Sequence, residues 1–563
     1  MNLSSFYEGF RNHLIRIGTG YHYADLYRIA ETKNLGIDPK TGLTLPPRSP
    51  VIDVTDTPYV FSPEGDRRNW SIYLQDIWNF ASNWELTAGI RFDEYSDFGK
   101  TTNPRLALVW QTRPELTTKL LYGQAFRAPS FQQMNNVNNP ALLGNPNLKP
   151  ETIETWELAF DYRATDNLHL ALNLFAYDIT DKILFEPIPD AQSGGMAQNT
   201  GRQKGQGFEF EASWKITKKS SLLLNYAFQD STDENNDHEV GFAPQHQVYL
   251  RNDWLLFPNW FLNTQLNSNV WAPEVDRNNW YVFLQDSWQI SSDWEFTAGI
   301  RYDEYSDFGS TTNPRAALVW QAQSNLTTKL LFGSAFRAPV FNELYISNNA
   351  LQMGNPNLEP ETIKTWELAF DYKATKTLNF ALNLFHYDIK DKILYVLDDP
   401  NATEVSMVAQ NAGMWAGNGL ELETRWQISP KANLLFNYAF QKSEDDKTGQ
   451  ELGNSPEHQA YLRTDWLLFP NWFLDTQVNW AGDWSRKPGD PRKKVDDSTT
   501  VDLTLRHKDS NQNRWNLAVG VRNLFDEDVR IPSFIPDTDG LIYIPNDYPL
   551  YKRSYWAELR YRF

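Results

Sequence analysis

Hydrophobic and polar residues alternate along most of the chain. In residues 155–162, Trp, Leu, Phe and Tyr occupy the even positions, and Thr, Glu, Ala and Asp occupy the odd ones. Residues 555–563 have the same period, with Tyr, Ala, Leu, Tyr and Phe at the odd positions. A period of two places successive side chains on opposite faces of a β-strand. We therefore predict an all-β protein whose strands have one apolar, aromatic face and one small, polar or charged face.

The segments between the predicted strands fall into two length classes. Short turns alternate with long loops that are rich in polar residues, Gly and Pro. Short turns on one rim and long loops on the other are typical of an up-and-down antiparallel β-barrel, which in a membrane is a transmembrane barrel. The short turns include 163–167, 257–259 and 429–433, and the long loops include 128–150, 187–207, 338–360 and 526–552.

One long passage occurs twice. NWSIYLQDIW from Asn69 returns as NWYVFLQDSW from Asn279, and LRNDWLLFPNWFL from Leu250 returns as LRTDWLLFPNWFL from Leu462. The repeating unit is far longer than a solenoid or propeller repeat, so we interpret it as a duplicated block of one sheet. We predict a single barrel of about 24 strands. It comprises residues 1–563, with repeat 1 at about 61–270, repeat 2 at about 271–480 and closing strands at about 481–563.

Composition narrows the possible functions. The chain has no cysteine, which excludes disulfides, thiolate metal sites and a cysteine nucleophile. Its net charge of −19 is the opposite of what nucleic-acid binding requires. No run approaches the roughly 18 apolar residues of a membrane-spanning helix, and the first residues lack the apolar region of a signal peptide.

Tryptophan is concentrated near predicted strand ends. Trp254, Trp260, Trp466 and Trp472 surround the two FPNW turns. Indole rings favour the boundary between hydrocarbon and water, so we predict that these four residues form part of a membrane girdle. Alternation alone also allows a soluble carbohydrate-binding β-protein with an aromatic core.

Two loop motifs and the end of the chain resemble a known family. FRAP (residues 126–129) precedes GNPNLKPET (144–152), and both motifs return in the second copy. With VRNLFD (521–526) and the final YRF, they resemble TonB-dependent outer-membrane receptors, the nutrient transporters of Gram-negative bacteria. The resemblance implies a barrel in the lipid bilayer of the outer membrane and a small nutrient ligand. It also implies that the outer-membrane assembly machinery reads a signal at Tyr561 and Phe563.

The sequence departs from that family's full pattern. A complete member begins with a signal peptide, a TonB-contacting segment and a globular plug, and none of these is recognisable here. We therefore expect no plug domain, which puts coupling to TonB in doubt. The expected function is a large passive pore or a ligand-capturing barrel, and the alternative is a non-transporting scaffold or receptor remnant.

Charged residues define two kinds of candidate site. Arg127 and Arg337 end predicted strands where long loops begin, and Glu151 and Glu361 lie within the Pro-rich motifs at the ends of those loops. The guanidinium groups either grip a carboxylate or phosphate ligand or pair with acids and stiffen the rim. On the polar face of the strands, we predict a wet lumen lined by Arg91, Glu157, Asp161, Arg301, Glu367 and Asp371.

No group of residues has the spacing of a catalytic or metal site. The eight histidines lack HExxH or any paired zinc spacing. Adjacent acids such as Asp93 and Glu94 are typical of a solvated rim in a chain with 71 acidic residues. We expect neither enzyme activity nor a cofactor or metal.

Overall fold

The structure is a computed structural model of the chain. It describes residues 2–26, 31–33, 36–46, 49, 52–139, 142–188, 194–240, 243–271, 275–347, 352–397, 407–507, 515–533 and 547–561. None of the helices in this part of the chain is long and apolar enough to cross a membrane.

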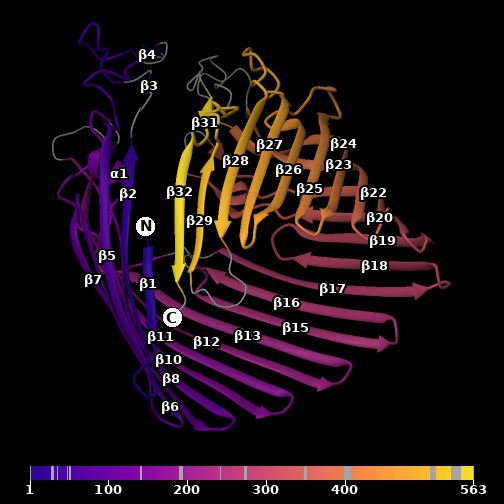
Figure 1. Ribbon diagram of the computed structural model, residues 1–563, viewed down its shortest axis with the longest axis horizontal. Helices are drawn as coiled ribbons and strands as arrows, with labels where there is room; N and C mark the ends of the chain where they lie inside the picture. Colours follow the sequence, from indigo (N-terminus) through magenta and orange to yellow (C-terminus); the bar gives the residue numbers. More distant parts are fainter. Residues whose placement is uncertain are drawn as a thin grey trace.

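One large sheet curves round to form the wall of a barrel (Figure 1). Within the described ranges it contains 28 strands, of which β9, β14 and β21 are two-residue strands in loops and 25 form the wall. The wall strands are β1 (Asn2–Tyr7), β2 (His13–Leu26), β5 (Gly65–Ala81), β6 (Trp84–Tyr95), β7 (Gly99–Arg113), β8 (Leu116–Arg127), β10 (Glu151–Thr165), β11 (Leu168–Pro187), β12 (Gly195–Thr217), β13 (Ser220–Asp233), β15 (His246–Phe257), β16 (Trp260–Trp271), β17 (Val275–Gln289), β18 (Trp294–Tyr305), β19 (Gly309–Gln323), β20 (Leu326–Arg337), β22 (Glu361–Lys373), β23 (Leu378–Leu397), β24 (Met407–Ser429), β25 (Ala432–Asp445), β26 (Pro456–Phe469), β27 (Trp472–Trp484), β28 (Ser498–His507), β29 (Trp515–Arg522) and β32 (Ser554–Tyr561).

The remaining elements are short and belong to the loops. Two five-residue helices start the loops that follow β8 and β20. The loop elements are β3 (Thr32–Lys33), β4 (Ile52–Asp53), α1 (Phe131–Asn135), β9 (Leu142–Leu143), β14 (His238–Glu239), α2 (Phe341–Tyr345), β21 (Gln352–Met353), β30 (Arg530–Ile531) and β31 (Tyr548–Pro549).

Each wall strand pairs antiparallel with the next one along the chain, which confirms the predicted up-and-down barrel. The described wall has one strand more than the predicted number of about 24. The predicted first strand corresponds to β2, and the additional strand is β1, whose residues 2–7 pair with residues 15–20 of β2. β1 is short and its sequence, NLSSFY, does not alternate strictly, so the period of two did not reveal it.

The first and last wall strands flank a seam. β1 ends opposite Ile15, near the start of β2, and β32 ends opposite Trp515, at the start of β29. Both strands therefore run toward the short-turn rim and are parallel to each other. No hydrogen-bonded register joins them among the described residues, so the barrel is nearly closed.

The two rims differ as predicted. One rim has short turns, such as the two-residue connections between β7 and β8 and between β15 and β16. The other rim has the long loops, including 128–150 and 338–360, together with two tight turns at 96–98 and 306–308. Gly99 and Gly309 follow these tight turns with φ of 96° and 88°, a conformation that disfavours side chains.

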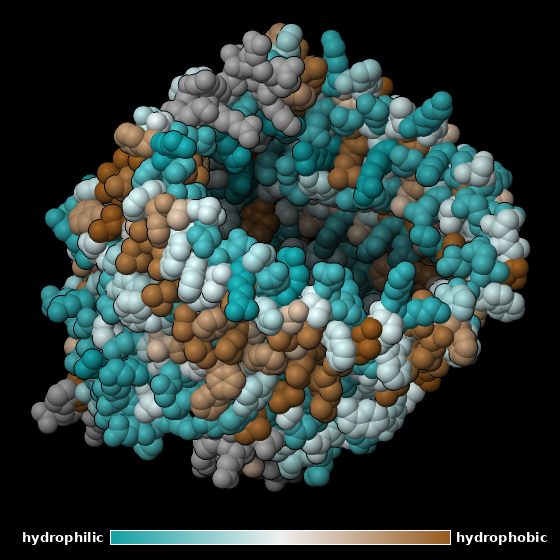
Figure 2. Space-filling view, turned by 90° about the horizontal axis from the view of Figure 1, so that it is seen from below, coloured by the Kyte–Doolittle hydropathy of each residue, from teal (hydrophilic) through white to brown (hydrophobic). Residues whose placement is uncertain are grey.

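The wall has its hydrophobic face on the outside. Trp156 on β10 is 53% exposed, and only eleven hydrophobic residues in the described ranges are buried. Figure 2 shows a deep hollow lined largely by hydrophilic residues, with hydrophobic residues gathered on the outer wall. Lipid rather than a protein core therefore covers most of the apolar surface.

Residues 157 and 158 provide a test of the two faces. Leu158 pairs with Leu120 and Leu174 on the outer face, whereas Glu157 accepts a hydrogen bond from Asn173 on the inner face. Leu158→Arg should cost about 2 to 4 kcal/mol of folding free energy because it places a guanidinium in hydrocarbon. Glu157→Arg should fold nearly as well as the unchanged chain. Heat-modifiable electrophoresis after refolding into vesicles measures both, and equal yields of the two variants would contradict the face assignment.

Candidate functional site

The first candidate site is an ion pair at the base of the loop 128–150. Arg127 and Glu151 are direct cross-strand partners at the ends of β8 and β10. The Nε and Nη2 atoms of Arg127 each donate to one carboxylate oxygen of Glu151, 2.5 Å away. The backbone N–H of Ile183 also donates to Glu151, at 2.6 Å. The loop is therefore closed at its base by a bidentate pair fixed to a third strand, β11.

The second copy has a larger version of this pair. Nη2 of Arg337 donates to Glu361 at 2.5 Å, and both terminal nitrogens donate to Glu343 of α2 at 3.1 Å. Lys392 donates to the other oxygen of Glu361 at 3.0 Å, and the Ile393 N–H donates at 2.9 Å. In the first copy, Gln133 stands where the second has Glu343, so the additional acid distinguishes the two copies.

A small hydrophobic cluster lies behind each ion pair. Met134, Leu148, Ile183 and Ala197 are buried together in the first copy, and Leu344, Leu358, Ile393 and Ala409 in the second. Gly144 is required where the loop meets α1, because a Cβ there would lie 2.5 Å from a backbone nitrogen. We call each assembly of short helix, Pro-rich motif, cluster and ion pair a rim module.

In each rim module the arginine is already bound to a carboxylate of the same chain. The side chains of Glu151 and Glu361 are 11% and 7% exposed, so each arginine pairs with a largely buried carboxylate. An incoming carboxylate or phosphate ligand would have to displace that partner. Each arginine is thus paired with an acid at the base of its loop, the arrangement expected if the guanidinium group stiffens the rim.

Two of the predicted lumen arginines form compact pairs on the inner wall. Arg91 donates to Asp93 at 2.7 Å from both Nε and Nη2. Arg301 makes the equivalent pair with Asp303, and its guanidinium carbon lies 3.6 Å from the ring centroid of Tyr281. Both aspartates are fully buried, so each arginine neutralises a carboxylate within the wall.

The four predicted lumen acids lie in two equivalent groups. Glu157 and Glu367 accept hydrogen bonds from Asn173 at 3.2 Å and Asn383 at 3.0 Å. Asp161 lies 3.1 Å from Nε2 of His169, and Asp371 lies 2.7 Å from Nζ of Lys329. Cavities of 430 and 500 Å³ open beside the two groups. We call these groups the wall patches; their further polar residues are Lys119, Glu209, Glu211 and Asn225 in the first copy, and Glu421, Glu423 and Asn437 in the second.

A larger cavity of 840 Å³ lies against β25 to β29 and was not predicted from sequence. Polar side chains of the strands, such as Gln459 and Asn479, line it together with aromatic rings, such as Trp480, and with Lys552 and Arg553 of the loop before β32. Nearby, Asp547 accepts from Arg486 at 2.6 Å and from the Ser533 N–H at 3.0 Å. Burial raises the pKa of the Asp547 carboxyl, but these donors outweigh burial and lower it to about 2.

The predicted girdle residues lie near the short-turn rim. Trp254, Trp260 and Trp466 are 41%, 43% and 43% exposed, and the ring of Trp472 lies 5.1 Å from that of His507. Tyr561 ends β32 opposite Trp515, and Phe563 lies outside the described residues.

One group in the described ranges can hold a metal. Glu457, His458 and Asp483 at the loop rim each offer one ligand atom, and these atoms lie within 4.8 Å of one another.

A sequence model of the TonB-dependent receptor-like β-barrel matches the chain twice, at residues 9–270 and 259–524. These matches together cover most of the chain. The chain belongs to the TonB-dependent receptor-like β-barrel family. As a member, it is a barrel of the Gram-negative outer membrane, and the soluble alternative is wrong.

Relatives agree with this family. The vitamin B12 transporter BtuB of Photobacterium profundum is 25% identical over 310 residues, which are 54% of this chain and 46% of that protein. The iron-regulated outer membrane virulence protein of Vibrio cholerae is 24% identical over 48% of this chain and 44% of that protein. The chain thus spans about half the length of the curated relatives it matches. The relatives are named as transporters and outer-membrane proteins rather than enzymes.

Solved structures share the fold. The siderophore receptor PirA of Acinetobacter baumannii has a TM-score of 0.54 and 13% identity, over 87% of this chain and 85% of that one. The ferric enterobactin receptor PfeA of Pseudomonas aeruginosa has a TM-score of 0.55 and 14% identity, over 88% and 78%. These identities support the architecture of the family barrel.

The rim modules can be tested with paired variants. Glu361→Ala should cost about 1 to 3 kcal/mol of unfolding free energy, because it leaves the Ile393 N–H without its acceptor. Glu343→Gln should cost less, about 0.5 to 1 kcal/mol, because an amide oxygen can still accept from the Val340 N–H, as Gln133 accepts from the Ser130 N–H in the first copy. Urea unfolding in vesicles, followed by tryptophan fluorescence, compares the two. Equal costs would show that Glu361 does not anchor the module.

Proposed function

We propose that the chain forms a wide outer-membrane barrel whose hydrated lumen admits small polar solutes. The polar inner wall carries this proposal. Its equivalent wall patches hold carboxylates, amides and a lysine, and Figure 2 shows a hollow lined largely by hydrophilic residues inside an outer wall where hydrophobic residues gather. A charged wall keeps water in the lumen, because drying it would leave those groups unsolvated.

The circumference of the wall supports a passage. Barrels of about 16 to 18 strands already enclose an aqueous channel, and those of about 22 strands hold a plug. The described wall has 25 strands. The proposal is that solutes pass through a lumen of this width without an energy source. A ligand-capturing barrel is the variant in which the outer loops hold the solute.

The balance of charge favours cations. Each wall patch has several carboxylates and one lysine, Lys119 or Lys329. The whole chain has a net charge of −19. A lumen with this sign raises the local concentration of cations and lowers that of anions.

The proposed partners follow from the location of the barrel in the outer membrane. They are the lipid bilayer, a small nutrient ligand, and the assembly machinery that would read Tyr561 and Phe563. Relatives named for vitamin B12 and siderophores support a nutrient as the solute. No enzyme activity, cofactor or nucleic acid is proposed.

Planar bilayer recording tests the passage. The refolded chain should give a large conductance without any energy source, with a weak preference for cations. Neutralising the wall patches with Glu209→Gln and Glu211→Gln, and Glu421→Gln and Glu423→Gln, should reduce that preference without closing the pore. The matched control is Glu343→Gln in the rim module, which should leave selectivity unchanged. A sealed bilayer with verified folded insertion would contradict the passage and favour the scaffold.

A further inference from the structure

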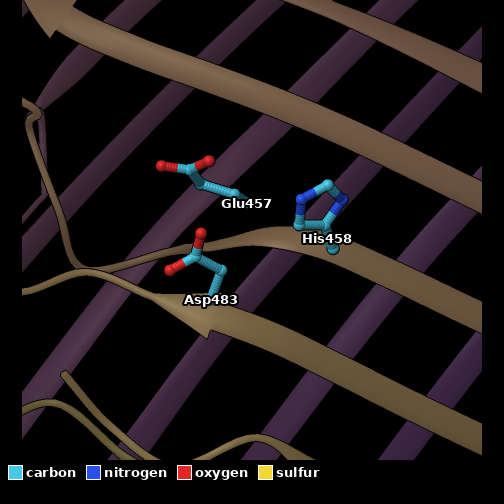
Figure 3. A group of neighbouring side chains, drawn as sticks. All are labelled: Glu457, His458 and Asp483. Atoms are coloured by element: carbon cyan, nitrogen blue, oxygen red, sulfur yellow. The ribbon is translucent and has the colours of Figure 1, made fainter.

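Three side chains that are separated in sequence meet at the loop rim of the second copy. Glu457 and His458 begin β26, and Asp483 lies near the end of β27 (Figure 3). His458 pairs with Gly482 and Pro456 pairs with Trp484, so Glu457 and Asp483 lie at the same level on neighbouring strands. Figure 3 shows the two carboxyl groups next to each other and the imidazole ring beside them.

The imidazole is oriented for a ligand. The Tyr438 hydroxyl lies 2.8 Å from Nδ1 of His458. When Nδ1–H donates to this oxygen, the proton is fixed on Nδ1 and the lone pair of Nε2 is free. Histidines that bind metals are held in this way, with the second ring nitrogen donating to a neighbouring oxygen.

The two carboxylates are available to different extents. Among the described residues, the Glu457 carboxylate accepts no hydrogen bond and forms no ion pair within 4.0 Å, although Lys442 and Lys494 are near enough to attract it electrostatically. Asp483 pairs through Oδ1 with Nζ of Lys494 at 2.5 Å, which leaves Oδ2 for another partner. Lys494 therefore competes with any cation for Asp483.

The first copy provides an internal comparison. His246 lies 2.9 Å from the Tyr226 hydroxyl through Nδ1, as His458 does from Tyr438. The residue before it is Gln245, where the second copy has Glu457. In the first copy, Trp271 stands where the second copy has Asp483. The first copy thus has an equivalent oriented histidine but neither carboxylate.

We propose that Glu457, His458 and Asp483 bind a divalent transition-metal ion, with Zn²⁺ as the best fit. One imidazole nitrogen and two carboxylate oxygens suit Zn²⁺, whereas Mg²⁺ and Ca²⁺ prefer oxygen ligands alone. Zn²⁺ lies about 2.0 to 2.2 Å from each ligand. The three ligand atoms lie within 4.8 Å of one another, and rotation of the carboxylate side chains would bring them to a common ion. Three protein ligands leave a fourth position for water.

This site does not depend on a conducting lumen, because its ligands stand at the loop rim. Sequence spacing did not reveal it, since Asp483 meets Glu457 only through strand pairing. The proposed site differs from the expectation, based on histidine spacing in the sequence, that the chain binds no metal.

Equilibrium dialysis of the full folded chain against Zn²⁺ tests the proposal. Excess Mg²⁺ in the buffer occupies clusters of carboxylates that contain no histidine, so these clusters do not contribute to the measured Zn²⁺ binding. The unchanged chain should bind about one Zn²⁺ at this site, and His458→Asn, Asp483→Asn and Glu457→Gln should each weaken binding by about tenfold or more. The matched control, His246→Asn, should leave affinity unchanged, and Lys494→Gln should strengthen it. Heat-modifiable electrophoresis verifies that each variant folds.

A second measurement needs no variant. Diethyl pyrocarbonate modifies accessible imidazoles, and mass spectrometry reports the modification of each histidine. Zn²⁺ should protect His458 and leave His246 as reactive as before. Equal protection of the two histidines, no protection of His458, or a loss of affinity in His246→Asn as large as in His458→Asn would each overturn the proposal.

Discussion

The structure depends on the pairing of backbone hydrogen-bonding groups in a solvent that cannot replace them. In the hydrocarbon core of a bilayer, an unpaired N–H or C=O group has no water to bind, so each strand must pair on both sides. Consecutive antiparallel registers meet this requirement from β2 to β29 within the described residues. The seam between β1 and β32 is where the ladder of hydrogen bonds is interrupted.

This constraint also reverses the usual position of the core. Lipid covers the apolar outer face, so the barrel wall does not enclose a large hydrophobic core. Among the described residues, the buried hydrophobic clusters are the two small ones in the rim modules. Those modules tie the long loops to the wall through Arg127 and Arg337. A block of ten wall strands is even in number, so its repetition keeps the direction of every following strand. Two equivalent rim modules and two equivalent wall patches result.

The sequence predicted the features that depend on local periodicity. Alternation revealed the strands and the outer face, and loop lengths revealed the two rims. The short strand β1 lacked that alternation and was missed. Features that depend on register were predicted only in part, because spacing does not show which residues lie opposite each other. The bidentate pairing of Arg127 with Glu151 and the meeting of Glu457, His458 and Asp483 both follow from strand register, which spacing along the chain does not show.

The central claim is that alternate residues of each wall strand face water and lipid. The absence of cysteine makes this directly measurable, because a single introduced cysteine is the only thiol in the chain. Cysteines placed one at a time at residues 156–161 of β10 can be exposed to a water-soluble maleimide in intact vesicles. The account predicts labelling at 157, 159 and 161, and protection at 156, 158 and 160. Uniform labelling, or labelling without a period of two, would contradict it.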